Sequence, residues 1–178
     1  MNFRQKLEYG KAGESCIARW LRRDGYIVLP VYEKAFDDHK GPRLYLPSNE
    51  LIAPDLLIMK NGKAYWIEAK RKHAFTWHRN TECFVTGIDQ RHYHDYCIIG
   101  SRTRWPVWLF FLQEGGQAKN SPPSPPGLYG QSLAYLRDHE HHRHWNWGPS
   151  GMVYWAIDDL KLWASLDELE LQMTQEAP

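Results

Sequence analysis

Two acidic residues and a lysine stand on neighbouring apolar segments of the chain, where they are suited to metal and phosphate chemistry. Asp55 lies near the start of one segment, and Glu68 and Lys70 lie near the end of the next. The two segments are separated by Asn61-Gly62, a pair typical of tight two-residue turns. The spacing therefore predicts a β-hairpin that brings the two carboxylates close together.

The predicted hairpin has strands at 53–59 and 63–70. Because side chains alternate along a strand, Glu68 and Lys70 are expected on one face and Ile67 and Ala69 on the other. The polar pair should then line a site while the apolar pair packs inward.

Two carboxylates beside a lysine suit a hard divalent cation that meets a phosphate. Mg²⁺ prefers oxygen ligands, takes one or two carboxylates and keeps several waters. Such an ion polarises a phosphate and makes a bound water more acidic. A neighbouring lysine can orient that water and offset negative charge that grows on the phosphate oxygens. The competing interpretation is a solvated hairpin end whose three charges pair only with each other.

Pro54-Asp55, twelve intervening residues and then Glu68-Ala69-Lys70 resemble the signature of the PD-(D/E)XK nuclease superfamily, which has the restriction-endonuclease-like fold. The resemblance covers about residues 8–100. Upstream, Gly10-Lys11-Ala12-Gly13-Glu14 and the stretch Gly25-Tyr26-Ile27-Val28 are similar to the first helix and strand of the Holliday-junction-resolvase-like branch.

This resemblance implies roles for individual residues. Asp55, Glu68 and the main-chain carbonyl of Ala69 would ligate the metal, Glu14 would reach the same site from the first helix, and Lys70 would be catalytic. Many relatives carry a glutamine on the next helix with a tyrosine four residues later.

The glutamine of that pattern is matched here by Gln90, but His94 occupies the following position. The tyrosines Tyr93 and Tyr96 stand three and six residues after the glutamine. Gln90 is therefore a candidate for the site or for nucleic-acid contact, or it is an ordinary polar residue in a first helical turn. The role of the tyrosine stays open.

Hydrophobic periodicity and turn residues predict the order of elements. A helix at 3–24 and a strand at 26–32 come first, followed by a polar loop at 33–52. After the hairpin come a basic loop at 71–84, a helix capped by Thr86 or Asp89 that runs to about Ile99, and a central strand at 105–112.

Further along, the Pro-rich segment 115–130 predicts an exposed loop, and 151–157 predicts a strand. Ser165-Leu166-Asp167-Glu168 is a capping-box pattern that should open a C-terminal helix.

These elements predict an α/β protein with a restriction-endonuclease-like αβββαβ core, in which helices flank a mixed central sheet, and with an extra C-terminal strand and helix. With 178 residues, a single domain spanning 1–178 is expected. Its core would occupy about 3–114, the Pro-rich loop 115–130, and the C-terminal strand and helix 150–175.

The uneven charge distribution favours a nucleic-acid partner. The net charge is only +1, but the segment 60–104 holds nine Lys or Arg against four Asp or Glu. Arg71, Lys72 and Arg79 are candidates for phosphate contacts. Trp77 lies between basic residues and could stack on an unpaired base or simply pack under its loop.

A second cluster, Asp138-His139-Glu140-His141-His142-Arg143-His144, is rich in possible metal ligands. Clean helical spacing is absent and Arg143 repels a cation. The segment is therefore interpreted chiefly as an exposed loop that titrates near pH 6 to 7.

The sequence therefore predicts a Mg²⁺-dependent phosphodiesterase, in which Mn²⁺ can substitute, acting on nucleic acid and most simply on DNA. An endonuclease is favoured over an exonuclease, and resolution of DNA junctions would require a homodimer. Two alternatives remain: a nucleic-acid-binding module that keeps the nuclease fold without catalysis, and a metal sensor built from the histidine cluster.

The expected compartment is the cytoplasm. There is no apolar signal region or bilayer-length apolar run, and the odd number of cysteines, three, argues against a disulfide framework. No membrane partner is expected, and the motif order suits a protein of a phage or other mobile element.

Overall fold

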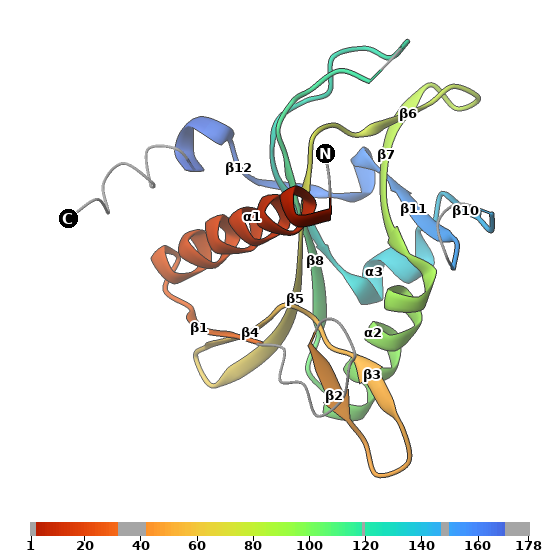
Figure 1. Ribbon diagram of the computed structural model, residues 1–178. Coiled ribbons are helices and arrows are strands. Elements are labelled where there is room, and N and C mark those ends of the chain that lie inside the picture. Colours follow the sequence, from red (N-terminus) through yellow and green to blue (C-terminus); the bar gives the residue numbers. More distant parts are fainter. Residues whose placement is uncertain (1–2, 32–41, 119, 147–149, 170–178) are drawn as a thin grey trace.

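The protein has a mixed α/β fold built on a central six-stranded sheet (Figure 1). The computed structural model describes residues 3–31, 42–118, 120–146 and 150–169. The strands lie in the order β1-β4-β5-β8-β9-β12. Their bounds are Ile27–Pro30 for β1, Leu56–Lys60 for β4, Lys63–Lys72 for β5, Val107–Gln113 for β8, Gly127–Ser132 for β9 and Lys161–Ala164 for β12. The pair β5–β8 is parallel and the other neighbours are antiparallel, so the sheet is mixed.

Two smaller sheets accompany the central one. A four-stranded sheet has the order β10-β11-β7-β6, and a two-stranded sheet pairs β2 with β3. Their bounds are His142–His144 for β10, Met152–Ala156 for β11, Cys83–Asp89 for β7, Thr76–His78 for β6, Arg43–Tyr45 for β2 and Glu50–Ile52 for β3.

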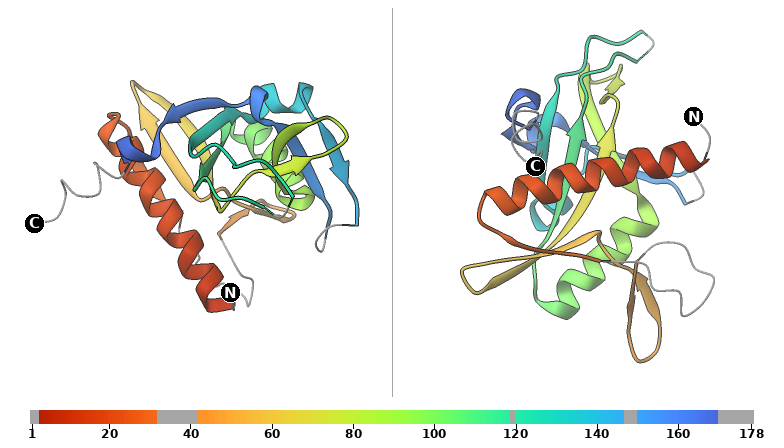
Figure 2. Two further views of the ribbon diagram at one scale, coloured as in Figure 1. Left: turned by 90° about the horizontal axis from the view of Figure 1, so that it is seen from above. Right: turned by 60° about the vertical axis from the view of Figure 1, so that its left-hand side comes forward.

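Helices cover both faces of the central sheet, as the two views of Figure 2 show. The helix α1 (Phe3–Arg23) crosses one face, while α2 (Gln90–Thr103) and the short α3 (Leu133–Asp138) lie on the other. A 3₁₀ turn, η1 (Ile157–Asp159), joins β11 to β12.

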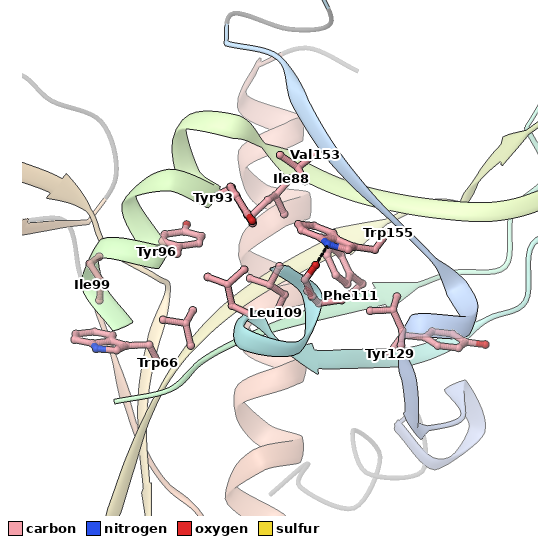
Figure 3. Packing of buried hydrophobic residues seen from close by; sticks show 14 of the residues in the cluster. Trp66, Ile88, Tyr93, Tyr96, Ile99, Leu109, Phe111, Tyr129, Val153 and Trp155 are labelled. Carbon is pink, nitrogen blue, oxygen red and sulfur yellow. Dashed lines mark hydrogen bonds between the residues drawn. The ribbon is translucent and has the colours of Figure 1, made fainter. Parts of the chain in front are cut away.

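The core is divided into two layers by the central sheet. On the α1 side, Ile17 and Leu21 pack against Ile67 and Ala69. On the α2 side, a larger cluster joins the central sheet to the helices and to the four-stranded sheet (Figure 3). Within it, the Trp155 Nε1 donates a hydrogen bond of 2.8 Å to the carbonyl oxygen of Leu136. The central sheet therefore lies between two packed layers.

The predicted hairpin is confirmed as β4 and β5. Lys60 pairs with Lys63, and Asn61 and Gly62 between them have φ angles of 53° and 73°. Two successive positive φ angles are the geometry of the turn that Asn-Gly favours. Further along the pair, Leu56 lies opposite Ile67, so Asp55 stands beside the strand position of Glu68.

The predicted core order α-β-β-β-α-β is found as α1, β1, β4, β5, α2 and β8. The segment 107–113 is central in the sheet, as its apolar composition indicated. Asp89, not Thr86, caps α2, because its side chain accepts a hydrogen bond of 3.0 Å from the Arg91 N–H. The capping box is also confirmed, since the Ser165 N–H donates to Glu168 Oε2 at 2.6 Å and residues 166–169 are helical.

Four expectations of irregular structure were wrong. The segment 42–52, expected as loop, contains the β2–β3 hairpin, and the basic segment 71–84 contains β6 and the ends of β5 and β7. The Pro-rich segment 115–130 ends in β9, which pairs with β8, and the histidine-rich segment contains β10. In each case pairing with a partner strand overrides weak local strand propensity. Parts of three expected elements lie outside the described residues: the end of the strand 26–32, the loop at 33–41 and the C-terminal helix at 170–175.

No helix within the described ranges combines the length and apolar character needed to cross a membrane.

Candidate active site

Asp55 lies at the entrance to β4, directly beside the middle of β5. Its Oδ2 accepts a hydrogen bond of 2.9 Å from the Ala69 main-chain N–H. This bond spans the hairpin and fixes the carboxylate next to the strand that carries Glu68 and Lys70. The turn and the register of the hairpin thus determine where the first acid stands.

Glu68 is the most buried charged residue of the site, with 1% of its surface exposed. Its Oε2 accepts a hydrogen bond of 2.5 Å from the hydroxyl of Tyr96 on α2. Its Oε1 forms an ion pair with Lys70 Nζ but makes no well-oriented hydrogen bond. The imidazole of His92 also approaches, with Nδ1 at 4.0 Å from Oε1. Glu68 is thus positioned by α2 through one oxygen and leaves the other facing charged groups.

Alternation along β5 places the side chains as the sequence predicted. Glu68 and Lys70 form an ion pair on the side of the strand that faces Tyr96, whereas Ile67 and Ala69 belong to the core beneath α1.

The pKa values of the site residues are shifted because several carboxylates lie close together and are largely buried from water. Burial, followed by the negative charge of Glu68, raises the pKa of Asp55 to about 8. Burial alone would lower the pKa of Lys70, but the charges of Glu68 and Asp55 raise it above its ordinary value. Lys70 therefore stays protonated at neutral pH, while Asp55 resists ionisation until another positive charge arrives.

Glu14 joins this group from α1. The helix approaches β5 closely at Gly13, where an added Cβ would lie 2.5 Å from the Cβ of Arg71. Burial raises the pKa of Glu14, Lys70 opposes this effect and Glu68 adds to it. The structure thus places Glu14 within electrostatic reach of both Glu68 and Lys70.

The helix α2 contributes two residues whose roles the sequence did not assign. Tyr96 is 1% exposed and donates a hydrogen bond to Glu68, whereas the side chain of His94, four residues after Gln90, is exposed. His92 lies one turn before Tyr96, with its Nδ1 at 3.4 Å from the tyrosine hydroxyl, and burial lowers the pKa of His92. Their helical spacing in the sequence could have indicated both residues. His92 lies four residues before Tyr96, and Tyr96 lies three residues before the buried Ile99, so they share its helix face.

Gln90 is the first residue of α2 and is partly buried. Its main-chain N–H donates to the carbonyl of Gly151 at 3.0 Å, but its Oε1 is buried without a hydrogen-bond partner. The side chain thus keeps an unused acceptor, and no contact joins it to Asp55 or Glu68.

The basic candidates separate into two groups. Lys72 extends the row of Glu68 and Lys70 along β5, and burial together with Lys70 lowers its pKa to about 8. Arg71 points to the opposite face, where its Nη2 lies 2.6 Å from Glu114 Oε1 and its guanidinium covers the ring of Tyr9. Lys72 is therefore near the acidic residues, and Arg71 is engaged elsewhere.

The remaining two candidates lie on or beside β6. Trp77 is half-buried and packs edge-on against Phe84, with 4.9 Å between ring centroids. Arg79 is exposed in the turn that follows β6. The contact with Phe84 agrees with one of the two interpretations of Trp77, namely packing under the loop.

The donor set suits a divalent cation, although no three described His, Cys, Asp or Glu side chains form a closed ligand group as they stand. Asp55 and Glu68 are each fixed through one oxygen by a protein donor, an arrangement that orients ligating carboxylates. The raised pKa of Asp55 also indicates that Lys70 does not offset the negative charge that two ionised carboxylates would bring here. A cation held by Asp55, Glu68, the Ala69 carbonyl and Glu14 would supply the positive charge that these carboxylates lack.

Comparison with known proteins gives a similarity of structure alone. No family model matches the sequence, and no curated protein matches it. Among solved structures, one similar chain is Hjc, a Holliday junction resolvase from the archaeal hyperthermophile Archaeoglobus fulgidus, known at 1.6 Å resolution. The TM-score is 0.49 and the identity 8%, over 81% of this chain and 86% of that chain. The mixed α/β fold, with helices on both sides of a mixed sheet, is established by the chain's own structure, and the roles of its site residues depend on its own geometry.

Proposed function

We propose that the protein is a metal-dependent nuclease that hydrolyses phosphodiester bonds of DNA. The observation that carries this proposal is the pair Asp55 and Glu68, two adjacent carboxylates beside the ammonium of Lys70, with the pKa of Asp55 raised to about 8 by burial and by Glu68. Groups with strongly shifted pKa values and a specific charged partner are enriched at functional sites.

In this proposal Asp55, Glu68, the Ala69 carbonyl and Glu14 hold Mg²⁺, or Mn²⁺ in its place. The bound ion supplies Lewis-acid activation of the phosphate and of water. The chain's own groups do the positioning: the Ala69 N–H holds Asp55, and Tyr96 holds Glu68.

Lys70 provides the positive charge that remains beside the reacting phosphate. Its raised pKa keeps the ammonium protonated, so it can stabilise negative charge that develops on phosphate oxygens and can orient a water molecule. Lys72, two residues further on the same strand face, is suited to bind the neighbouring phosphate of the DNA backbone. A phosphate there would favour the charged form of Lys72, whose pKa of about 8 lies near neutrality.

The experiment is a cleavage assay on linear, nicked, branched and single-stranded DNA with Mg²⁺. Asp55→Ala and Lys70→Ala should each reduce cleavage by about 10²-fold or more, since removal of one transition-state donor has an effect of that size. EDTA should silence the protein, and Ca²⁺ should support binding without turnover. Lys63→Ala is the matched control, because Lys63 is exposed on the same strand and distant in register from Glu68.

Closed circular DNA distinguishes internal cleavage from digestion of ends, because it has no end. We expect it to be cut, as an endonuclease requires. Activity of Lys70→Ala equal to that of Lys63→Ala, with both variants folded by circular dichroism, would refute the assignment of the site.

A catalytically inactive DNA-binding module is the second candidate, and one observation favours it. Both oxygens of Glu68 already face protein groups, Tyr96 on one side and Lys70 on the other. Calorimetric titration with Mg²⁺ separates the two functions, since the nuclease must bind the ion in a manner that depends on Asp55 and the inert module need not.

A further inference from the structure

Three possible metal ligands converge on a single hydroxyl group beside the four-stranded sheet, away from the carboxylates of the candidate active site. Thr81 Oγ1 lies 2.7 Å from His78 Nδ1, 3.0 Å from His141 Nε2 and 3.2 Å from Cys83 Sγ. His78 ends β6, Cys83 begins β7, and His141 directly precedes β10. The fold thus brings residues about sixty positions apart to one point.

The chemistry of these donors is that of a zinc site. Zn²⁺ is bound by thiolate and imidazole in a tetrahedral arrangement, with bonds of about 2.3 Å to sulfur and about 2.0 Å to nitrogen. Those bond lengths place a sulfur and a nitrogen ligand about 3.5 Å apart across a tetrahedral angle. Cys83 Sγ and His141 Nε2 are 3.6 Å apart.

We propose that His78 Nδ1, Cys83 Sγ and His141 Nε2 form a binding site for a zinc-class divalent cation. The Thr81 hydroxyl lies among the three donors, at the place the ion would take. The site is latent, because no three such side chains in the described ranges form a closed group as they stand, and Thr81 must turn away or become the fourth ligand. Thr81 is exposed and lies in the turn between β6 and β7.

A second contact supports the ligand role of His141. Its other ring nitrogen, Nδ1, lies 2.7 Å from Nδ1 of His142. One of these two nitrogens must donate and the other accept. A histidine that binds a metal through Nε2 characteristically donates its Nδ1–H to a neighbouring acceptor. His142 is held in place for that purpose by stacking on Tyr154, with 4.6 Å between ring centroids and 6° between planes.

The sulfur of Cys83 is not tied up in a disulfide. Cys83 is a free cysteine and is partly exposed, so an ion can reach it. Binding releases the thiol proton and leaves a thiolate on the metal.

Only one of the three ligands, His141, belongs to the histidines that stand together in the sequence. His139 stacks on Tyr135, with ring centroids 3.8 Å apart, and its Nδ1 lies 2.8 Å from the Tyr135 carbonyl oxygen. The other two ligands, His78 and Cys83, come from β6 and β7, in another part of the chain. An ion bound here would connect β6 and the start of β10, the two edge strands of the four-stranded sheet, and would act as a clip between them.

The test uses Co²⁺, whose bond to a thiolate gives a charge-transfer band in the near ultraviolet that carboxylate ligands do not give. The reduced full-length protein should bind one Co²⁺ per chain with this band, and Zn²⁺ should displace it. Cys83→Ser should abolish the band, and His141→Gln should weaken Co²⁺ binding at least tenfold. The controls Cys97→Ser and His139→Gln, outside the cluster, should leave the band unchanged.

Thermal unfolding gives an independent measurement. Zn²⁺ should raise the unfolding midpoint of the wild type and of Cys97→Ser by more than it raises that of Cys83→Ser, which keeps only the carboxylates of the candidate active site. Absence of the thiolate band in the wild type, or its persistence in Cys83→Ser, would overturn the proposal. Because the band reports sulfur, an ion bound at Asp55 and Glu68 does not produce it, and the outcome is independent of nuclease activity.

Discussion

At the scale of single residues, the candidate active site depends on hydrogen bonds that hold each carboxylate through one oxygen. Tyr96 is the buried member of this arrangement, with its hydroxyl 2.5 Å from Glu68 Oε2. Outer groups of this kind orient metal ligands, and their loss typically reduces metal affinity or activity by about 10–100-fold. In the proposed nuclease Tyr96 would therefore act as a positioning residue, through Glu68.

Tyr96→Phe keeps the packed ring and removes only the donor to Glu68. We expect the cleavage rate to fall by about 10–100-fold and the Mg²⁺ concentration for half-maximal activity to rise. Tyr93→Phe is the matched control, because the Tyr93 hydroxyl on the same helix donates to Glu140 instead. If the two variants cleaved DNA equally well, the positioning role of Tyr96 would be wrong.

Asp55 gives a prediction for stability against pH. Its folded-state pKa of about 8 lies above the ordinary value of 3.8 because of burial and the charge of Glu68. Between these two values the folded protein binds one more proton than the unfolded chain. The free energy of unfolding therefore falls as pH rises, by at most about 1.4 kcal/mol per pH unit, and levels off above the folded pKa.

Asp55→Asn removes this titration and should make the metal-free protein more stable than the wild type at neutral pH. The difference in unfolding free energy should be small at pH 4, grow up to about pH 8 and then stay constant. The difference can be measured by urea denaturation in EDTA. The control is Asp138→Asn, at an exposed position on α3, for which the difference from the wild type should not change with pH. A difference independent of pH would contradict the raised pKa.

At the scale of elements, the site depends on where α1 crosses β5. Gly13 permits this approach, since an added Cβ would lie 2.5 Å from the Cβ of Arg71, whereas a Cβ at Gly10 meets only Glu14 Oε1 at 4.0 Å. Both glycines lie inside the same helix, where alanine is intrinsically better by about 1 kcal/mol. The two positions therefore isolate the effect of the close approach.

Gly10→Ala should stabilise the protein by up to about 1 kcal/mol and leave activity unchanged. Gly13→Ala should instead lower the unfolding free energy by about 1–3 kcal/mol, as overpacking does, and should reduce cleavage because Glu14 moves with the helix. Urea denaturation and the cleavage assay measure these effects. Stabilisation by Gly13→Ala without loss of activity would show that the helix does not need this contact.

The same scale shows what the sequence could predict. The hairpin 56–72 was predictable because its turn chemistry, its apolar strands and its polar residues act locally and agree. The strand β9 was not, because Gly127 and Gly130 have weak strand propensity and the strand exists through pairing with β8. The convergence of His78, Cys83 and His141 depends on the folding of three separate strands, so no spacing in the sequence could indicate it.

At the scale of the whole molecule, the central sheet connects two packed layers that hold the site between them. Glu68 on β5 bonds to α2 on one side, while Ile67 and Ala69 pack beneath α1 on the other. Leu109 on the neighbouring strand β8 is fully buried in the larger cluster, which also includes Trp155 of the four-stranded sheet. Packing on the α2 side should therefore stabilise all of these elements together.

Leu109→Ala tests this coupling. Truncation of a fully buried leucine should lower the free energy of unfolding by about 2–5 kcal/mol. If the layers unfold as one unit, circular dichroism and tryptophan fluorescence should report the same shifted urea midpoint. Leu162→Ala is the control, since Leu162 on β12 is 57% exposed and its truncation should cost less than about 0.5 kcal/mol. Separate midpoints for the two signals would mean that the four-stranded sheet unfolds independently of the sheet that carries the carboxylates.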